Sequence, residues 1–327
     1  MAKDKRYGNY RLDRLIGHGV MGAVYRAEDE STNQTVAVKV LPATVATNEE
    51  YTRRFLTEAR VAQRLDHPNI IRVRDYGRDN GHYYLAMEYV DGESCKARII
   101  REGKLPWREA VQIALQVARG LRAAAREGII HRDIKPENVL VDTQGRVRIA
   151  DLGLAKEQGR VEPMPSDTSL GTPDYMSPEQ VNNSETVDLR SDIYSLGASL
   201  FHMICGKAPY TGRSAYEVMV KHVNAELPSP HKYAPDLPRE VADVMRKMMA
   251  QDPEDRYQTY EDLLEDLSAL LAGAPVAARE FDRESLLGQN GLAKASSLYA
   301  GANRLLWVAV PVLAAVGGAV AYLLLSD

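Results

Sequence analysis

The first third of the chain alternates short apolar and β-branched runs with glycine-containing turns. The stretches YRLDRLIGHG, GAVYRAED and TVAVKVL, between residues 10 and 41, predict three strands with glycines between the first two. Residues 49–65 show the spacing of an amphipathic helix, and NIIRVRDYGRD and HYYLAMEYV predict two further strands. This part is therefore expected to form a small β-rich lobe that contains one helix.

From about residue 105 the apolar positions follow helical spacing instead. The stretch PWREAVQIALQVARGLRAAARE predicts a long helix that ends before Gly128. Similar periodicity recurs at 191–205, 240–250 and 260–271. The whole pattern predicts an α+β fold over residues 10–272, with a small β-rich lobe followed by a larger helical lobe.

The C-terminal end carries a different pattern. Residues 305–325 read LLWVAVPVLAAVGGAVAYLLL without a charged side chain, and as a helix they would extend about 31 Å, which is close to the thickness of a bilayer core. Trp307 and Tyr322 lie near its ends, and Lys294 and Arg304 precede it. We predict a single transmembrane helix with its N-terminal side in the cytoplasm. The alternative is a buried C-terminal helix.

Residues 273–304 are rich in Gly, Ala and Ser and predict a linker that leads to this span. Within the span, Ala314/Gly318 and Gly317/Ala321 have small-xxx-small spacing. Such spacing permits close helix–helix contact, so dimerisation through the span is possible, although small residues are common in membrane helices.

Charge and cysteine content narrow the function further. The 327 residues carry a formal net charge of −4 with no long run of one sign, which argues against a nucleic-acid partner. The two cysteines, Cys95 and Cys205, are too few for a disulfide framework or a zinc cluster, and they suit a reducing compartment.

A glycine-rich turn lies between the first two predicted strands. Gly17, Gly19 and Gly22 would let backbone N–H groups approach phosphate oxygens, although a tight hairpin explains the spacing equally well. Lys39, on the next strand, would supply a cation for those phosphates, unless it is an edge lysine that faces solvent. Glu58, on the following helix, is a candidate to orient Lys39 or an ordinary surface acid.

The densest group of ionisable residues is HRDIKPEN at 131–138. VLVD and VRIAD, which follow it, predict a hairpin whose ends would bring Asn138 and Asp151 together as two oxygen ligands. Mg²⁺ prefers such sites, with one or two protein oxygens plus phosphates and water. Asp133 would then accept the proton of an attacking hydroxyl, and Lys135 would hold the phosphate in transfer.

These motifs together resemble the eukaryotic-like (Hanks-type) serine/threonine protein kinases. The order G-x-G-x-x-G-x-V, V-A-V-K, H-R-D-I-x-x-x-N, D-L-G and S-P-E matches the family from about Tyr10 to Ala272. The Met at the loop tip, the sequence MSPE and the single apolar span favour the membrane-anchored bacterial branch. The resemblance implies a bilobal kinase fold, with ATP and Mg²⁺ as cofactors and proteins as substrates.

The resemblance also implies roles for individual residues. Gly17, Gly19 and Gly22 would cover the phosphates, and Lys39, paired with Glu58, would contact the α- and β-phosphates. The Glu88 carbonyl and the Val90 N–H would bind the adenine edge, with Met87 as gatekeeper. The residues expected to enclose adenine are Ile16, Val24, Ala37 and Leu140. The catalytic base would be Asp133, the γ-phosphate contact Lys135, and the magnesium ligands Asn138 and Asp151.

Other residues have structural roles by the same resemblance. Glu179 and Arg256 match an ion pair of the helical lobe, and Asp192 matches the residue that holds the catalytic loop. His131 is expected to pack behind Leu152. Lys135 and Thr172 resemble the pattern of serine/threonine-specific enzymes rather than that of tyrosine-specific ones.

Residues 151–179 are expected to form an activation segment. Autophosphorylation at Thr168 or Ser169 would give Arg132 a phosphate to pair with, whereas the alternative is that this hydroxyl-rich stretch is simply a loop. A silent nucleotide-binding scaffold is disfavoured because Lys39, Asp133 and Asp151 are all present. A small-molecule phosphotransferase is disfavoured by the complete activation segment.

Overall fold

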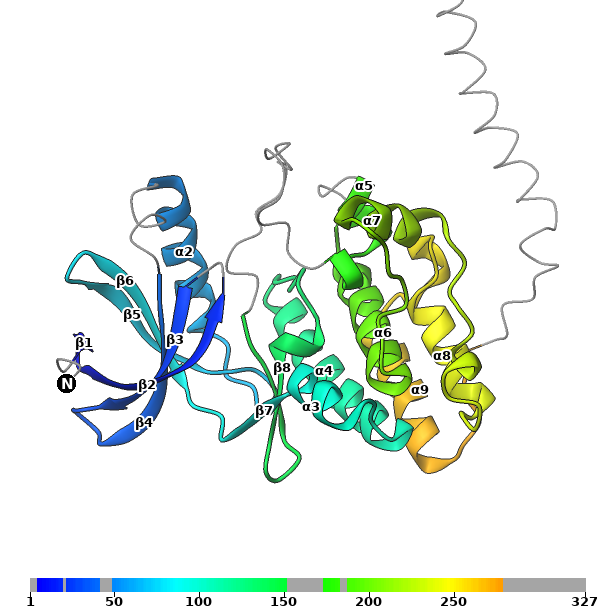
Figure 1. The fold of residues 1–327 in the computed structure, drawn as a ribbon, viewed down its shortest axis with the longest axis horizontal. Helices are drawn as coiled ribbons and strands as arrows, with labels where there is room; N and C mark the ends of the chain where they lie inside the picture. The colour runs from blue at the N-terminus through cyan, green and yellow to red at the C-terminus, as the bar shows by residue number, and fades with distance from the viewer. Residues whose placement is uncertain (1–4, 20–21, 42–48, 152–172, 183–186, 279–327) are drawn as a thin grey trace, which may run out of the picture. The chain divides into compact units, whose positions relative to one another are not determined.

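A computed structural model describes residues 5–19, 22–41, 49–151, 173–182 and 187–278, apart from some side chains within 49–61. An antiparallel six-stranded sheet forms the N-terminal lobe (Figure 1), in the order β1-β2-β3-β4-β6-β5. Its strands are β1 (Arg6–Tyr7), β2 (Tyr10–Gly19), β3 (Gly22–Asp29), β4 (Gln34–Val40), β5 (Val73–Asp79) and β6 (His82–Glu88).

The two faces of this sheet bury different side chains. Val36, Val38 and Val40 point into a cluster on one face with Tyr7, Tyr10 and Tyr84. Ala37 lies in a second cluster, to which helix α2 (Glu49–Ala62) contributes Phe55, Ala59 and Ala62. This division follows from the period-two alternation of strand side chains, and it assigns the β4 face that carries Ala37 and Lys39 to the side of α2.

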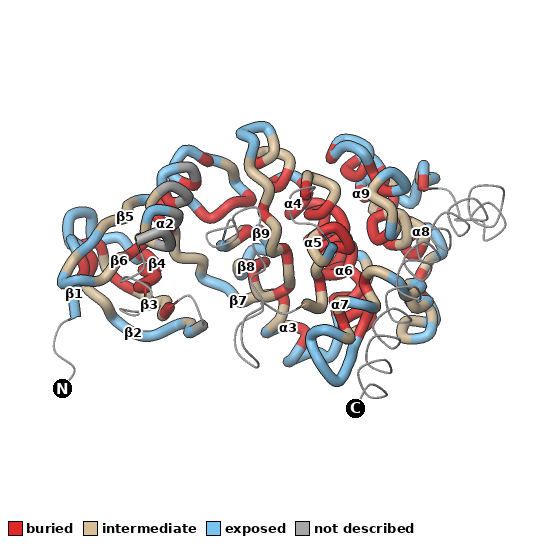
Figure 2. The backbone as a smooth tube through the Cα atoms, turned by 90° about the horizontal axis from the view of Figure 1, so that it is seen from above, coloured by how far each residue is buried: buried red, intermediate tan, exposed pale blue. Residues whose placement is uncertain are grey.

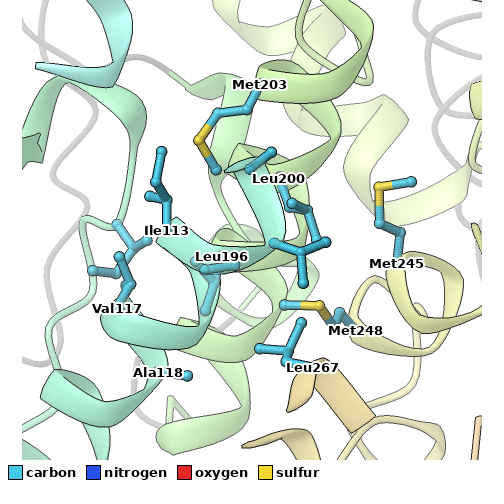
Figure 3. Packing of buried hydrophobic residues seen from close by; sticks show 14 of the residues in the cluster. Ile113, Val117, Ala118, Leu196, Leu200, Met203, Met245, Met248 and Leu267 are labelled. Atoms are coloured by element: carbon cyan, nitrogen blue, oxygen red, sulfur yellow. The ribbon is translucent and has the colours of Figure 1, made fainter. Parts of the chain in front are cut away.

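The second lobe is mainly helical, as its sequence pattern predicts. Helix α6 is buried along nearly its whole length (Figure 2), and α4 packs against both α6 and α9. The core of this lobe contains Ile113 and Val117 from α4, Leu196 and Leu200 from α6, and Met248 from α8 (Figure 3). Its helices are α3 (Cys95–Glu102), α4 (Trp107–Arg126), α5 (Pro178–Asn182), α6 (Leu189–Cys205), α7 (Ala215–Asn224), α8 (Arg239–Met248) and α9 (Tyr260–Ala272).

A small three-stranded sheet, in the order β7-β8-β9, lies beside these helices. Its strands are β7 (Gly92–Ser94), β8 (Val139–Asp142) and β9 (Val147–Ile149). The predicted hairpin is therefore confirmed, with Val139 opposite Ile149. The segment that follows α2 also binds β9, because the Ile149 N–H donates to the Asn69 carbonyl and the Ile71 N–H donates to the Ile149 carbonyl, both at 2.9 Å.

The end of the described chain is held by a buried carboxylate on α9. Asp266 is 1% exposed and accepts hydrogen bonds from the Tyr257 hydroxyl at 2.6 Å and from the N–H groups of Ala277 at 2.6 Å and Ala278 at 2.9 Å. Three donors offset much of the cost of burying this charge. Residues 277 and 278 are thus fastened to the helical lobe.

The helices of the described ranges include none with the length and apolarity needed to cross a bilayer. The predicted span at 305–325 lies outside those ranges, as does the part of the predicted linker beyond residue 278.

Two buried tyrosine–histidine pairs join α6 to neighbouring elements. The Tyr175 hydroxyl lies 2.7 Å from Nδ1 of His202, and the Tyr194 hydroxyl lies 2.8 Å from Nδ1 of His222. Burial lowers the pKa of His202 to about 4, with a further contribution from Lys96, and burial also lowers the pKa of His222 to about 4. Both rings are therefore neutral acceptors for the tyrosine hydroxyls at neutral pH.

These two histidines predict a loss of stability in acid. In the unfolded chain a histidine takes up a proton near pH 6.5, whereas in the fold these rings resist protonation until about pH 4. The free energy of unfolding should therefore fall as the pH drops from about 6.5 toward 4, by on the order of 3 kcal/mol for each group. Urea unfolding between pH 7.5 and 4.5 measures this slope.

The variants His202→Asn and His222→Asn keep a side-chain acceptor near Nδ1 but cannot be protonated. Each is expected to be less stable than the parent at pH 7.5 and to show a shallower loss toward pH 4.5. An equally steep slope in the double variant would show that other groups cause the acid sensitivity.

Candidate active site

The glycine turn joins β2 to β3, and one of its glycines is required by the backbone. Gly22 has φ +120°, and a Cβ there would lie 2.2 Å from the Val40 carbonyl oxygen. Gly17 pairs with Val24 and would meet only ordinary contacts. The chain continues as strand β3 after the turn, which confirms the strand predicted for GAVYRAED. Residues 20 and 21 at the tip lie outside the described residues.

Lys39 lies on β4, which is an interior strand between β3 and β6. Its side chain is only 7% exposed, and its Nζ lies 2.7 Å from Oδ1 of Asp151. The alternative that Lys39 is a solvent-facing edge lysine is therefore wrong. Glu58 belongs to α2 as predicted, but its side chain lies outside the described atoms, and its pairing with Lys39 stays a prediction.

Most of the residues expected to enclose adenine share one apolar cluster. Ala37 and Met87 are buried members of it, and they lie opposite each other on β4 and β6. Val24, Val90 and Leu140 pack against the same cluster. Ile16 is 41% exposed, and Glu88 ends β6 with its carboxylate 3.2 Å from Nε of Arg148 on β9.

The catalytic-loop prediction is supported by a set of short polar contacts. Oδ2 of Asp133 accepts a hydrogen bond from Nζ of Lys135 at 2.8 Å and from Nδ2 of Asn138 at 3.1 Å. Asn138 also donates to the Asp133 carbonyl at 2.8 Å. The carboxylate is 28% exposed, so it remains open to a substrate while a cation and an amide fix its direction.

Asp192 on α6 holds the backbone of the catalytic loop. Its carboxylate accepts from the N–H of His131 at 2.8 Å and from the N–H of Arg132 at 2.7 Å. Burial raises the pKa of this carboxyl, although His131, Arg132 and their N–H groups favour the charged form. The predicted role of Asp192 is confirmed. His131 is buried and its Nε2 lies 3.0 Å from the Ala150 carbonyl, while Leu152 lies outside the described residues.

Asn138 and Asp151 flank the open end of the β8–β9 hairpin. The Ala150 N–H donates to the Asn138 carbonyl at 2.8 Å, so Asp151 follows directly after a residue bonded to Asn138. Asn138 uses its amide N–H groups on Asp133, which leaves its amide oxygen for a cation. An amide oxygen and a carboxylate fit a Mg²⁺ site whose remaining ligands are phosphates and water.

Two residues of the site have left-handed backbone conformations that are uncommon for side chains with a Cβ. Arg132 has φ +63° and Asp151 has φ +54°. Strain of this kind persists where the surrounding contacts impose it. Here those contacts include Asp192 beneath Arg132 and Lys39 against Asp151.

The predicted ion pair of the helical lobe is confirmed and buried. Nη1 and Nη2 of Arg256 lie 2.7 and 2.9 Å from the two carboxylate oxygens of Glu179. Burial alone would raise the pKa of Glu179, but the hydrogen bonds and charge of Arg256 outweigh it and lower that pKa. Sequence reasoning missed Gln180, the next residue, whose amide reaches the catalytic loop; its only signal is that it follows the S-P-E motif.

Thr168, Ser169 and Thr172, together with the D-L-G residues after Asp151, lie outside the described residues. The predictions of phosphorylation and of an ordered activation segment therefore remain predictions. After Asp151, the next described residue of that segment is Pro173, which begins the short helix Pro173–Tyr175.

The residues described above are contributed by both the β-rich lobe and the helical lobe. The sequence matches the protein kinase domain family over residues 10–267, so the chain belongs to the protein kinase family. Among solved structures it resembles the kinase domain of Mycobacterium tuberculosis PknI, with a TM-score of 0.66 and 29% identity over 82% of this chain and 98% of that domain.

The relatives of this chain include bacterial proteins named as serine/threonine-protein kinases. The chain is 39% identical to PrkC of Bacillus subtilis over 260 residues, which are 80% of this chain and 40% of PrkC. It is 36% identical to PknE of Mycobacterium bovis over 269 residues, or 82% of this chain and 47% of PknE. The chain thus aligns with less than half the length of these relatives.

Proposed function

We propose that this protein is a serine/threonine protein kinase that transfers the γ-phosphate of ATP to hydroxyl groups of proteins in the presence of Mg²⁺. The observation that carries the proposal is the convergence of Asp133, Lys135 and Asn138 at one carboxylate, with the Lys39–Asp151 pair across the lobes. Relatives named as serine/threonine-protein kinases support the activity and the choice of acceptor.

Asp133 and Lys135 have separate roles in the transfer reaction. The bond between the γ-phosphorus and the oxygen that bridges it to the β-phosphate breaks, while the acceptor hydroxyl oxygen bonds to the γ-phosphorus. Asp133 takes the hydroxyl proton, and ADP leaves with the bridging oxygen. Lys135, 2.8 Å from Asp133, balances the charge on the transferring group. Positioning and charge neutralisation supply most of the rate in such reactions.

Asn138 and Asp151 are the residues that would hold the metal. When bound, Mg²⁺ would neutralise phosphate charge at this end of the hairpin. Nζ of Lys39 lies 2.7 Å from Oδ1 of Asp151. The ammonium group that would contact the phosphates therefore lies beside the carboxylate that would bind the metal.

One experiment distinguishes this proposal from a small-molecule phosphotransferase and from a silent scaffold. The full chain is incubated with γ-labelled ATP and Mg²⁺, together with an unfolded generic protein or with small alcohols, sugars and amines. We expect label on serine and threonine of the protein and none on the small acceptors. Label on small acceptors alone, or nucleotide binding without transfer, would contradict the proposal.

Lys39 provides a prediction about nucleotide binding. Lys39→Met keeps the length of the side chain but removes the buried ammonium group. Since a charge-assisted contact contributes about 2–3 kcal/mol, kcat/KM for ATP should fall about 30- to 150-fold. Steady-state kinetics with varied ATP measures this ratio, with Lys207→Met as a surface control. A loss below about threefold would exclude a phosphate contact for Lys39.

We further propose autophosphorylation at Thr168 or Ser169, where the hydroxyl-rich activation segment supports the proposal. A phosphate there would pair with Arg132, which directly precedes Asp133. Mass spectrometry after incubation with ATP is expected to find phosphate between residues 160 and 175. A segment without phosphate in an otherwise active enzyme would contradict this part of the proposal.

We also propose that the protein is anchored in a membrane by residues 305–325, with the kinase domain in the cytoplasm. The support is the uncharged 21-residue run and the basic residues before it. The small-xxx-small spacing within the run supports dimerisation there. Extraction of membranes at alkaline pH is expected to leave the full chain in the pellet, and recovery in the supernatant would contradict anchoring.

A further inference from the structure

The side chain of Gln180 connects the end of the activation segment to the catalytic loop. Gln180 lies on α5, and its Oε1 accepts from the N–H of Ser177 at 3.0 Å and from the Ser177 hydroxyl at 3.1 Å. Its Nε2 donates to the Arg132 carbonyl at 2.8 Å. Because Ser177 uses both donors on Oε1, the orientation of the amide is fixed, and the NH₂ group points toward Arg132.

The acceptor is the carbonyl of the peptide that joins Arg132 to Asp133. Arg132 has a left-handed backbone with φ +63°. Its N–H is held by Asp192 at 2.7 Å, and the N–H of Asp133 points to Nδ1 of His131 at 3.3 Å. Gln180 binds the Arg132 carbonyl. The Arg132 N–H, the Arg132 carbonyl and the Asp133 N–H therefore each have a hydrogen-bond partner.

The orientation of this peptide determines where the Asp133 carboxylate lies. Rotation about the bonds of Arg132 would swing the Cα–Cβ bond of Asp133, and a displacement of about 1 Å in a reacting group can reduce a rate about 100-fold. The strained φ of Arg132 favours such a rotation unless contacts oppose it. Gln180 is placed to oppose it from the side of the activation segment.

The support behind Gln180 is rigid. Glu179, the residue before it, forms the buried pair with Arg256, and Ser177 is fully buried. A donor on such a support can hold a carbonyl more firmly than a donor on an exposed loop.

We propose that Gln180 is a positioning residue for phosphoryl transfer, which holds the Arg132–Asp133 peptide so that Asp133 faces the acceptor hydroxyl. The proposal rests on the kinase function proposed above. On this proposal, residues 177–180 contribute to the chemical step through the contact of Gln180 with the catalytic loop. Gln180 does not touch the nucleotide-binding residues in the contacts described, so ATP binding should be independent of it.

The test uses Gln180→Met, which keeps the size of the side chain and removes both polar atoms. We expect the single-turnover rate of transfer to a generic protein to fall about 10-fold, with KM for ATP within twofold of the parent. Gln180→Glu should lose at least as much, because a carboxylate would face the Arg132 carbonyl oxygen. Thermal unfolding of each variant is recorded in parallel.

Gln116 provides a matched control. Its amide also cross-links two segments: Oε1 accepts from the Val147 N–H and Nε2 donates to the Gly145 carbonyl, both at 3.0 Å. Gln116→Met should lower the unfolding temperature and leave the single-turnover rate within twofold. Gln180→Met should show the opposite division, a slower rate with a smaller change in unfolding temperature.

Two results would overturn the proposal. One is an unchanged single-turnover rate in folded Gln180→Met. The other is a loss of rate accompanied by an equal change in KM for ATP, which indicates general loosening of the fold. If Gln180→Met does not fold, Ser177→Ala is the deciding variant, because it removes one of the two donors that orient the Gln180 amide. A two- to threefold slower transfer with unchanged KM for ATP supports the proposal. An unchanged rate overturns it. If the parent enzyme transfers no phosphate at all, the proposed function itself fails, which is a separate outcome.

Discussion

Replacing Asp133 with asparagine is expected to slow phosphoryl transfer about 1,000-fold. The two side chains have nearly the same shape, so the contacts from Lys135 and Asn138 to this position can largely persist. An amide cannot take the proton of the acceptor hydroxyl, and general-base catalysis contributes roughly 10²- to 10⁴-fold. The loss should appear in the single-turnover rate, measured with γ-labelled ATP and a protein acceptor, while KM for ATP changes little.

Asp236→Asn makes the same chemical change at an exposed carboxylate in the helical lobe and should leave the rate unaltered. Full activity of Asp133→Asn would show that another group accepts the proton. A large rise in KM for ATP together with the slower rate would indicate that Asp133 supports the nucleotide rather than the hydroxyl.

The second large effect is expected at the buried Glu179–Arg256 pair. Arg256 is fully buried and directs its N–H groups to Glu179 and to the carbonyls of Arg190, Ala250 and Gln251, at 2.7–3.1 Å. Arg256→Ala leaves the Glu179 carboxylate buried without its cation and leaves three carbonyls without these donors. Removing one partner of a buried pair typically costs about 3–5 kcal/mol. The free energy of unfolding, from urea titrations at pH 7.5, should fall by that amount.

The exposed pair between Arg6 and Glu30, at 2.9 Å, is the control. Arg6→Ala is expected to cost less than about 1 kcal/mol because solvent screens the attraction. The double variant Glu179→Met/Arg256→Met should recover part of the stability, since no unpaired charge remains in the interior. If Arg256→Ala lowered the free energy of unfolding no more than Arg6→Ala, the buried Glu179–Arg256 pair would contribute no more to stability than an exposed ion pair.

The elements with strong periodicity were predictable from the sequence. The patterns at 10–19 and 22–29 correspond to β2 and β3, and the long helix α4 lies within the predicted stretch 106–127. Helices α3 and α7 were missed. They have 8 and 10 residues, so each shows only two or three helical turns of apolar spacing. Their N-caps, Ser94 and Ser214, were the available local signal.

The candidate site could be predicted only as far as motifs and local geometry reach. Asp133, Lys135 and Asn138 fall within six residues, so their contact follows from the loop itself. The contact between Lys39 and Asp151 spans 112 residues and depends on how the lobes meet, which no local pattern encodes. Gln180 was missed for the same reason, since its partner lies 48 residues away. Lys39 shares its face of β4 with Ala37, because alternate residues of a strand point the same way. An interpretation of the sequence that places Ala37 on the opposite face together with Val40 is therefore wrong for Ala37, whereas Val40 does lie on the opposite face.

The left-handed residues set a limit on how this enzyme can be made more thermostable. Glycine would remove backbone strain at positions 132 and 151, yet it would delete the side chains on which the chemistry depends. Asn33 and Asn80 have similar backbone angles, φ +56° and +49°, in turns between strands of the N-terminal lobe. Glycine substitutions intended to raise thermal stability should therefore be made at Asn33 and Asn80. The backbone strain at Arg132 and Asp151 has to be kept, because their side chains are needed for activity.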